Sequence, residues 1–107
     1  MAAAPDIDRL FRALGDPTRR SILAALSRGP CSVSRLAGPL GITVTAVAQH
    51  LRELEAVDLV RTEKLGRVRT CRIEPAGFDR LEAWIRDHRS HWELGLDRLS
   101  DFLSNDS

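Results

Sequence analysis

The chain has 107 residues, of which 43% are hydrophobic and 29% charged, a balance typical of one folded domain and not of a disordered or fibrous protein. No apolar run reaches the about 18 residues that a membrane span needs, and residues 1–5 lack the basic and apolar stretches of a secretory signal. We therefore expect a single cytoplasmic, nucleoid-associated domain over residues 1–107, with no membrane partner. The formal net charge of +1 excludes an overtly basic protein, and the two cysteines are too few for a disulfide framework.

Two short amphipathic helices are predicted at the start of the chain. Apolar residues at positions 7, 10, 11 and 14 share one face of a helix over about residues 6–14, which Gly15 ends. Asp16 is suited to the N-cap of a second helix and Pro17 to its first position, where the missing N–H costs nothing. Gly29-Pro30 predicts the end of this second helix.

A helix-turn-helix is predicted over about residues 32–56. Ser32 is suited to cap a short helix whose end is disturbed by Gly38-Pro39, and Thr43 is suited to cap the next helix after a tight connection. The second helix of the pair has an apolar face and, opposite to it, a face of small and polar residues. The apolar face holds Val47, Leu51 and Leu54, and the opposite face holds Thr45, Ala48, Gln49 and Arg52.

A β-hairpin is predicted over about residues 59–74, and a long helix over about residues 78–103. Two β-prone runs flank the turn Leu65-Gly66-Arg67, and Pro75 and Gly77 are expected to close the hairpin. Its central stretch is strongly basic, whereas acidic residues outnumber basic ones beyond it. Residues 61–72 contain one acid, Glu63, and the basic residues Arg61, Lys64, Arg67, Arg69 and Arg72.

Two short helices followed by a basic hairpin are the pattern of a winged helix-turn-helix, a mostly α fold with a small β-hairpin (α+β). Such a fold inserts its recognition helix, here 43–56, into the major groove, where the Gln49 amide can pair bidentately with adenine. The basic wing lies along the phosphate backbone and supplies affinity more than sequence preference. The candidate DNA-binding residues are Thr43, Val44, Thr45, Ala48, Gln49, Arg52, Lys64, Arg67 and Arg69.

Three ordered segments resemble the ArsR-type family of bacterial winged-helix repressors. They are LGDPTRR at 14–20, SVSRLAGPLGITVTAVAQHLRELEAVDLV at 32–60 and RTEKLGRVRTCRIEPAGF at 61–78. The resemblance covers about residues 7–100 and implies a homodimeric repressor that binds a near-palindromic operator in double-stranded DNA. Ala48 departs from the family, where serine is common, so base reading at this position is expected to be apolar or absent.

Homodimer formation is also predicted from the residues. The last helix carries more apolar surface than a core of this size readily absorbs, and surplus apolar surface usually marks an interface. Helices 6–14 and 78–103 are the expected dimerisation elements, which is also the family arrangement. A two-fold axis would then place two recognition helices about one DNA turn, roughly 34 Å, apart. The candidate interface residues are Leu10, Phe11, Trp84, Ile85, Trp92, Leu96 and Leu99.

An effector is not assigned by the sequence, although many members of the family respond to a metal ion or to thiol oxidation. Ser32 and Ser34 occupy the places of the family's thiolate ligands, so that metal site is missing. The weak candidates for a transition metal such as zinc or nickel are Asp87, His88 and His91. Cys31, on a short first strand, and Cys71, on the outer strand of the wing, are weak candidates for a redox switch. No cofactor is expected to be required.

Two other classes of protein fit the sequence less well. No Gly-rich phosphate loop, nucleophile elbow or clustered metal motif is present, so an enzyme is not expected. A winged helix that binds a protein instead of DNA would carry an acidic or apolar wing, whereas this wing is basic. The sequence therefore favours a DNA-binding transcriptional regulator.

Overall fold

The computed structural model describes residues 4–105, so residues 1–3 and 106–107 of the expected domain lie outside the described part. The elements follow the predicted order: α1 (Ala4–Leu14), α2 (Pro17–Leu26), β1 (Cys31–Ser32), α3 (Val33–Leu40), α4 (Val44–Ala56), β2 (Val60–Leu65), β3 (Val68–Ile73) and α5 (Pro75–Asn105). The strands form an antiparallel sheet in the order β1-β3-β2. The predicted winged helix-turn-helix fold is confirmed.

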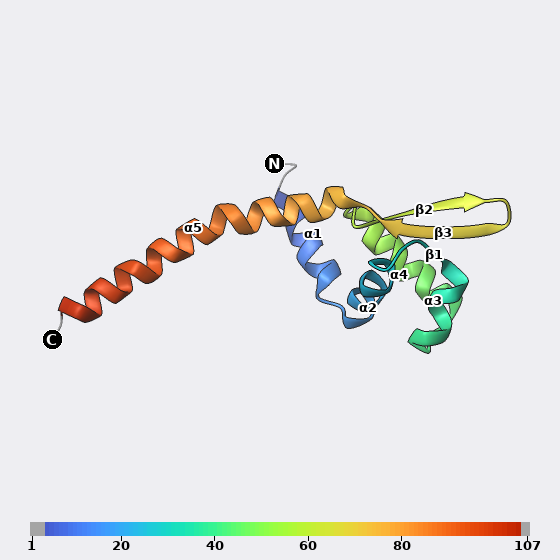
Figure 1. Cartoon of the computed structure of the whole chain (residues 1–107), viewed down its shortest axis with the longest axis horizontal. Coiled ribbons are helices and arrows are strands. Elements are labelled where there is room, and N and C mark those ends of the chain that lie inside the picture. Colours follow the sequence, from blue (N-terminus) through green and yellow to red (C-terminus); the bar gives the residue numbers. More distant parts are fainter. Residues whose placement is uncertain (1–3, 106–107) are drawn as a thin grey trace.

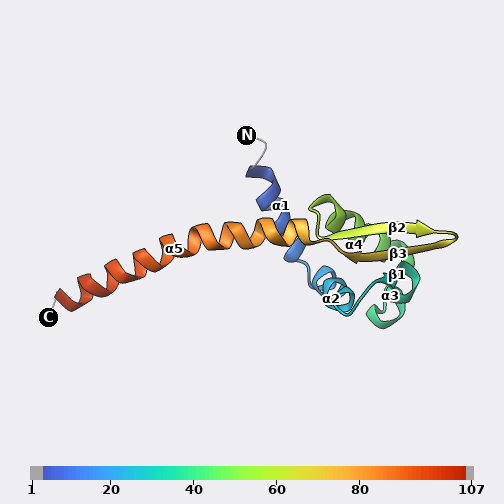
Figure 2. The same cartoon turned by 45° about the horizontal axis from the view of Figure 1, so that its top comes forward.

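The molecule has a compact head, residues 4–84, and a helical tail, residues 85–105. Figure 1 shows the β2–β3 hairpin, the wing, at one end of the molecule and the C-terminus at the other, along a longest dimension of 68 Å. In Figure 2, α1 crosses α5 where α5 leaves the head. Within the described residues, no helix combines the length and the apolar character needed to traverse a membrane.

One hydrophobic core fills the head, with side chains from all four short helices and from the sheet. Leu10, Ile22, Val47, Leu54, Leu59 and Cys71 are fully buried in it. The prediction that Leu10 lies in the dimer interface is therefore wrong, because its side chain has no surface left to offer a partner. Helical periodicity placed Leu10 on the apolar face of α1, but this face packs within the head.

The junction between α1 and α2 is built by the segment LGDPTRR. The Asp16 carboxylate caps α2 by accepting a hydrogen bond from the backbone N–H of Arg19 at 3.0 Å. This bond, together with the positive charge of Arg19, lowers the pKa of Asp16 although partial desolvation opposes the shift. Arg19 Nε donates to the Ala13 carbonyl at 2.8 Å, and Arg20 donates to the Leu14 carbonyl at 2.6 Å. The two arginines thus satisfy carbonyls that the end of α1 leaves open.

The first helix of the helix-turn-helix is longer than its sequence indicates. Pro39 lies inside α3, which continues to Leu40 and ends at Gly41 in the left-handed region with φ 66°. The Ile42 N–H donates to the Ala37 carbonyl, the bond expected of a Schellman-type ending. Ser32 stands at the N-cap position as predicted, but its side chain makes no capping bond.

The start of α5 corrects a second prediction. Pro75 and Gly77 do not close the hairpin but belong to the first turn of α5, because proline is well tolerated at a helix start. The Gly77 N–H donates to the Asp58 carbonyl at 2.8 Å, and a Cβ at this position would lie 2.6 Å from that oxygen. Arg80 donates to the Asp58 carboxylate at 3.1 Å. The loop after α4 therefore holds the beginning of α5 in close contact.

Candidate nucleic-acid interface

The recognition helix α4 separates its two faces as predicted. Thr43 caps it by accepting a hydrogen bond from the Ala46 N–H at 3.0 Å. The apolar positions Val47, Leu51 and Leu54 are buried in the core. On the opposite face Ala48 is half-buried, while the other predicted readers, Val44, Thr45, Gln49 and Arg52, are exposed.

The wing has two chemically different faces because its register is fixed by a two-residue turn. Gly66, with φ 64°, and Arg67 connect Leu65 to Val68, and a first turn residue with positive φ is suited to a tight hairpin. Successive side chains alternate between the faces of a strand. One face holds the pairs Val60–Ile73, Thr62–Cys71 and Lys64–Arg69, and the other holds Arg61–Arg72, Glu63–Thr70 and Leu65–Val68.

Ion pairs follow this alternation. Arg61 lies 2.9 Å from the Glu74 carboxylate, and Arg72 lies 3.4 Å from Glu63, so both arginines on the outer face have an acidic partner. Val60 and Cys71 are buried, which identifies the other face as the one toward the head. Lys64 and Arg69, on that face, and Arg67, at the turn, are exposed and form no salt bridge within the described residues. The cations of the wing that have no acidic partner therefore lie at the wing tip and on the side that faces α4.

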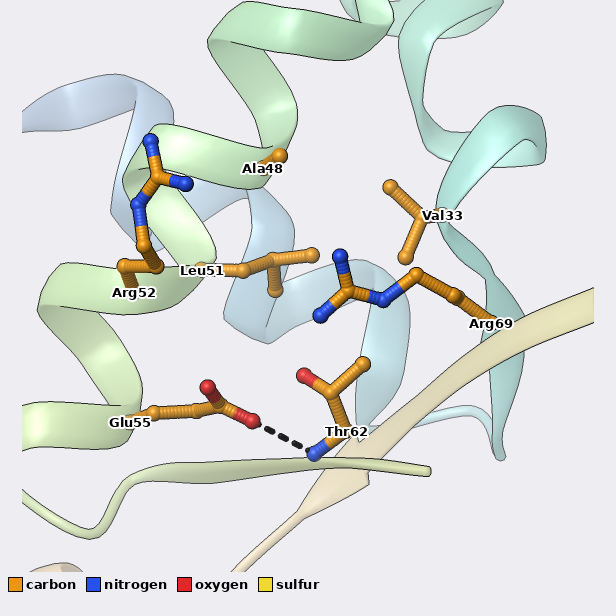
Figure 3. Close-up of a pocket in the computed structure, with 7 residues that line it drawn as sticks. All are labelled: Val33, Ala48, Leu51, Arg52, Glu55, Thr62 and Arg69. Carbon is orange, nitrogen blue, oxygen red and sulfur yellow. Dashed lines mark hydrogen bonds between the residues drawn. The ribbon is translucent and has the colours of Figure 1, made fainter. Parts of the chain in front are cut away.

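A groove of about 270 Å³ runs between the wing and the helix-turn-helix. It is lined by Val33, Ser34, Val44, Ala48, Arg67, Val68 and Arg69. A smaller cleft beside it adds Arg52, and Figure 3 shows the Arg69 guanidinium directed from the wing toward α4. Four predicted DNA-binding residues thus line one groove.

The wing is attached to the recognition helix by a bond that sequence reasoning missed. A Glu55 carboxylate oxygen at the end of α4 accepts a hydrogen bond from the Thr62 backbone N–H at 2.7 Å (Figure 3). Val33, Ser34 and Val68 are further groove residues absent from the prediction. Strand alternation could not have found Val68, because it places Val68 with Leu65 on the outer face. The role of Glu55 becomes visible only once α4 and β2 are packed together.

The remaining candidate interface residues lie along α5 and on α1. Trp84 is half-buried and makes an edge-to-face contact with Phe11, with ring centroids 5.0 Å apart. Phe11, Ile85, Trp92, Leu96 and Leu99 are exposed, between 42% and 65%. Sequence reasoning missed three further exposed apolar side chains of the tail: Leu94, Phe102 and Leu103. All except Leu10 are therefore placed where a partner could cover them.

The metal candidates on α5 are exposed side chains. His88 Nδ1 lies 2.8 Å from the Trp84 carbonyl oxygen, and its ring stacks on the Trp84 indole at 4.0 Å. Because a carbonyl only accepts, Nδ1 carries the proton of this bond. Among the described residues, no group of three or more histidine, cysteine, aspartate or glutamate side chains is close enough to hold a metal, and Asp87 and His91 form no such site with His88.

The two cysteines face one another across neighbouring strands. Cys31 pairs in register with Cys71, and β3, which carries Cys71, is the central strand instead of the outer one that we expected. The Cys71 thiol donates to the Cys31 carbonyl oxygen at 3.2 Å, and both thiols are free. Burial raises the pKa of Cys71 to about 11, with a smaller contribution from Cys31 beside it. Cys71 is therefore a neutral thiol at physiological pH, which disfavours its oxidation.

Comparison with known proteins identifies the family. A family model of helix-turn-helix domains matches residues 14–63. The chain is 39% identical over 99 residues to the HTH-type transcriptional regulator Rv2034 of Mycobacterium tuberculosis, an alignment that covers 92% of this chain and 90% of the relative. The crystal structure of an ArsR family transcriptional regulator superposes with a TM-score of 0.77 and 44% identity, over 83% of this chain and 92% of the other. The chain belongs to the ArsR family of winged helix-turn-helix transcriptional regulators.

Two other similarities extend this comparison. The HTH-type transcriptional regulator CmtR of Mycobacterium tuberculosis is 48% identical over 59 residues, which cover 55% of this chain and about half of CmtR. The homodimeric winged helix-turn-helix DNA-binding domain Mb0332 of Mycobacterium bovis superposes with a TM-score of 0.68 and 27% identity, over 86% of each chain. As a member of the family, this regulator is a DNA-binding protein and not an enzyme, as predicted.

Proposed function

We propose that this ArsR-family regulator is a homodimeric repressor that binds a near-palindromic operator through α4 and the wing. In this proposal Thr43, Val44, Thr45, Ala48 and Gln49 face the base edges. Arg52, Lys64, Arg67 and Arg69 neutralise phosphates on either side. In this proposal the protein acts in the cytoplasm, and the bound dimer represses transcription where the operator overlaps a promoter.

The separation of charges on the wing is the observation that carries the proposal. A solvated hairpin needs no particular arrangement of its charges, whereas a wing that lies along DNA needs unneutralised cations on the side of the recognition helix. Arg61 and Arg72, on the outer face, are paired with acids, while Arg69 is directed toward α4 without an acidic partner in the described part of the chain. This arrangement favours DNA over an acidic protein partner. The unpaired cations lie beside α4, and an α-helix fits into the major groove of DNA, so the cations would lie next to the phosphates that border that groove.

The homodimer is supported by the tail and by a relative. The apolar side chains of α5 beyond Trp84 are exposed in the single chain, and exposed apolar surface of this extent usually marks an interface. Mb0332, of similar fold, is described as homodimeric. A two-fold dimer would present two recognition helices to a palindrome.

The first test measures how the affinity for a fragment of the regulator's own upstream region depends on salt. If Arg52, Lys64, Arg67 and Arg69 of each protomer contact the backbone, the dimer makes about eight phosphate contacts. The affinity should then fall roughly 10⁴-fold between 50 and 200 mM salt. Binding is followed by fluorescence anisotropy of the labelled fragment. Absence of binding at 50 mM salt would overturn the proposal.

Arg69→Gln and Arg72→Gln form a matched pair on the same strand. Arg69→Gln should reduce the slope of log affinity against log salt by about two per dimer, because each protomer loses one phosphate contact. Arg72→Gln should leave the slope unchanged, since Arg72 lies on the outer face and pairs with Glu63. Equal effects of the two substitutions would contradict the proposed orientation of the wing.

A further inference from the structure

A second groove, of about 360 Å³, lies between α2 and α3. Its lining includes Ala25, Arg28, Cys31, Arg35, Leu36 and Leu40. Its volume is within the range of small-molecule sites, about 300–1,000 Å³. The DNA-binding residues described above do not line it, so it is a separate feature of the head.

This groove and the recognition groove lie on different flanks of α3. Ser34 lines the recognition groove beside α4 and the wing. Arg35 and Pro39 line the α2 side instead. Successive residues of a helix are turned by about 100°, so a molecule bound beside Arg35 would not occupy the DNA-reading face. A single helix nevertheless forms a wall of both grooves.

The chemistry of the α2–α3 groove is that of an apolar trough with cations beside it. Leu36 is buried, and Ala25 and Leu40 are half-buried, so the trough is apolar. Arg28 and Arg35 are exposed and form no salt bridge within the described residues. Residues 17–52, which include α2 and α3, contain no aspartate or glutamate, so neither helix that lines the groove supplies an acid to neutralise them. The apolar trough and the two arginines together indicate a ligand that has both an apolar part and a negative charge.

We propose that this groove binds a small amphipathic anion, an organic acid with one carboxylate and an unbranched apolar chain. The carboxylate would pair with Arg28 and Arg35, since guanidinium groups hold carboxylates through paired hydrogen bonds. The chain would lie on Ala25, Leu36 and Leu40. An inorganic anion would leave the trough unfilled, and a neutral hydrocarbon would leave the two cations unpaired.

The first experiment compares three probes by titration calorimetry of the full chain without DNA. Sodium decanoate should bind, whereas decanol, which lacks the charge, and acetate, which lacks the chain, should bind about tenfold more weakly or not at all. Arg28→Gln combined with Arg35→Gln should weaken decanoate binding about tenfold or more. Arg9→Gln, which removes an exposed arginine outside the groove, should leave it unchanged. Circular dichroism and the melting temperature show that each variant is folded.

A second measurement locates the bound probe by a thiol of the groove itself. Cys31 lines the groove and is half-buried, while Cys71 is fully buried and provides the internal control. Decanoate at ten times its Kd should slow alkylation of Cys31 by iodoacetamide about tenfold, because only about a tenth of the sites stay open. Mass spectrometry of the labelled peptides reports the rate at each cysteine.

Several results would overturn the proposal. Equal binding of decanoate and decanol, unchanged decanoate affinity in the double variant, or unprotected Cys31 at saturating decanoate would each do so. If the natural chain does not bind decanoate, and the double variant lowers the salt slope of DNA binding, then Arg28 and Arg35 contact phosphates instead. All ligand measurements use the protein without DNA, so their outcome does not depend on whether the proposed operator binding is correct.

Discussion

The head and the tail of this regulator carry the same apolar periodicity but use it differently. In α2 and α4 the periodic residues, such as Ile22 and Val47, are fully buried within one chain. In the tail every residue from Ile85 to Ser104 is exposed, including Leu96 at 65% and Phe102 at 67%. Periodicity therefore specifies which face of a helix is apolar, but not whether the same chain or a partner chain covers that face.

The two regions meet at a tightly packed joint. Gly77, on the first turn of α5, contacts the carbonyls of Val57 and Asp58, and Arg80 donates to both of these residues. Asp58 itself has φ 58°, an uncommon conformation for a residue other than glycine. The direction in which the tail leaves the head is thus set by the loop that ends the recognition helix.

Gly77→Ala should have the largest effect, because it breaks this joint. The added Cβ would meet the Val57 carbonyl oxygen and lie 2.6 Å from that of Asp58, and backbone atoms cannot move aside as side chains do. We expect a loss of roughly 3 kcal/mol in the free energy of unfolding, measured by urea denaturation.

Gly95→Ala, in the tail of the same helix, is the matched control. Nothing lies within 4 Å of a Cβ at this position in the single chain. The better helix propensity of alanine should therefore stabilise α5 by about 1 kcal/mol. A destabilisation as large as that of Gly77→Ala would mean that a partner chain packs closely against position 95, and the effect at Gly77 could then not be assigned to the joint alone.

Leu96→Glu combined with Leu99→Glu tests whether the tail is an interface. Charges at two exposed apolar positions should prevent dimerisation, since they would be buried without partners. Loss of the second recognition helix should reduce operator affinity roughly 100-fold or more. Light scattering gives the mass, and circular dichroism should show an unchanged head.

Ser90→Glu adds a charge to the same exposed helix without removing an apolar side chain, and should leave both the mass and the affinity unchanged. A double leucine variant that remains dimeric would place the interface elsewhere.

The difference between head and tail also explains which predictions from sequence succeeded. Local signals located Asp16, Thr43 and the hairpin turn, because a cap or a turn depends on neighbouring residues alone. Leu10 was assigned to the wrong surface, and Gly77 to the wrong element, because each depends on contacts between segments far apart in the chain.

The site was partly predictable for the same reason. Strand alternation from the turn at Gly66 already separates Lys64 and Arg69 from Arg61 and Arg72. The bond from Glu55 to Thr62 and the groove between α2 and α3 require the packed helices.

Within the head, Gln49→Ala and Arg67→Ala should separate base reading from backbone contact. Gln49→Ala should relax the preference at one base pair by about 1–3 kcal/mol, because the paired amide bonds to a base are lost. Arg67→Ala should weaken binding to all sequences alike and lower the salt slope. Affinities for single-base operator variants, measured by anisotropy, distinguish the two. Equal effects of both substitutions on every sequence would contradict the assigned roles.

The smallest expected effect concerns Asp16, at the junction inside the head. The backbone N–H of Arg19 and its positive charge hold the pKa of the Asp16 carboxylate below its ordinary value, against partial desolvation. A carboxylate whose pKa is lowered on folding stabilises the protein above its unfolded pKa of about 3.9, and this contribution is lost as the pH falls through the folded pKa. Asp16→Asn keeps a capping oxygen without the charge. The advantage of the natural chain over Asp16→Asn in urea denaturation should therefore be complete at pH 6 and shrink below about pH 4. A difference that stays constant with pH for Asp16→Asn would show that hydrogen-bond geometry, and not charge, sets the contribution of the cap to stability.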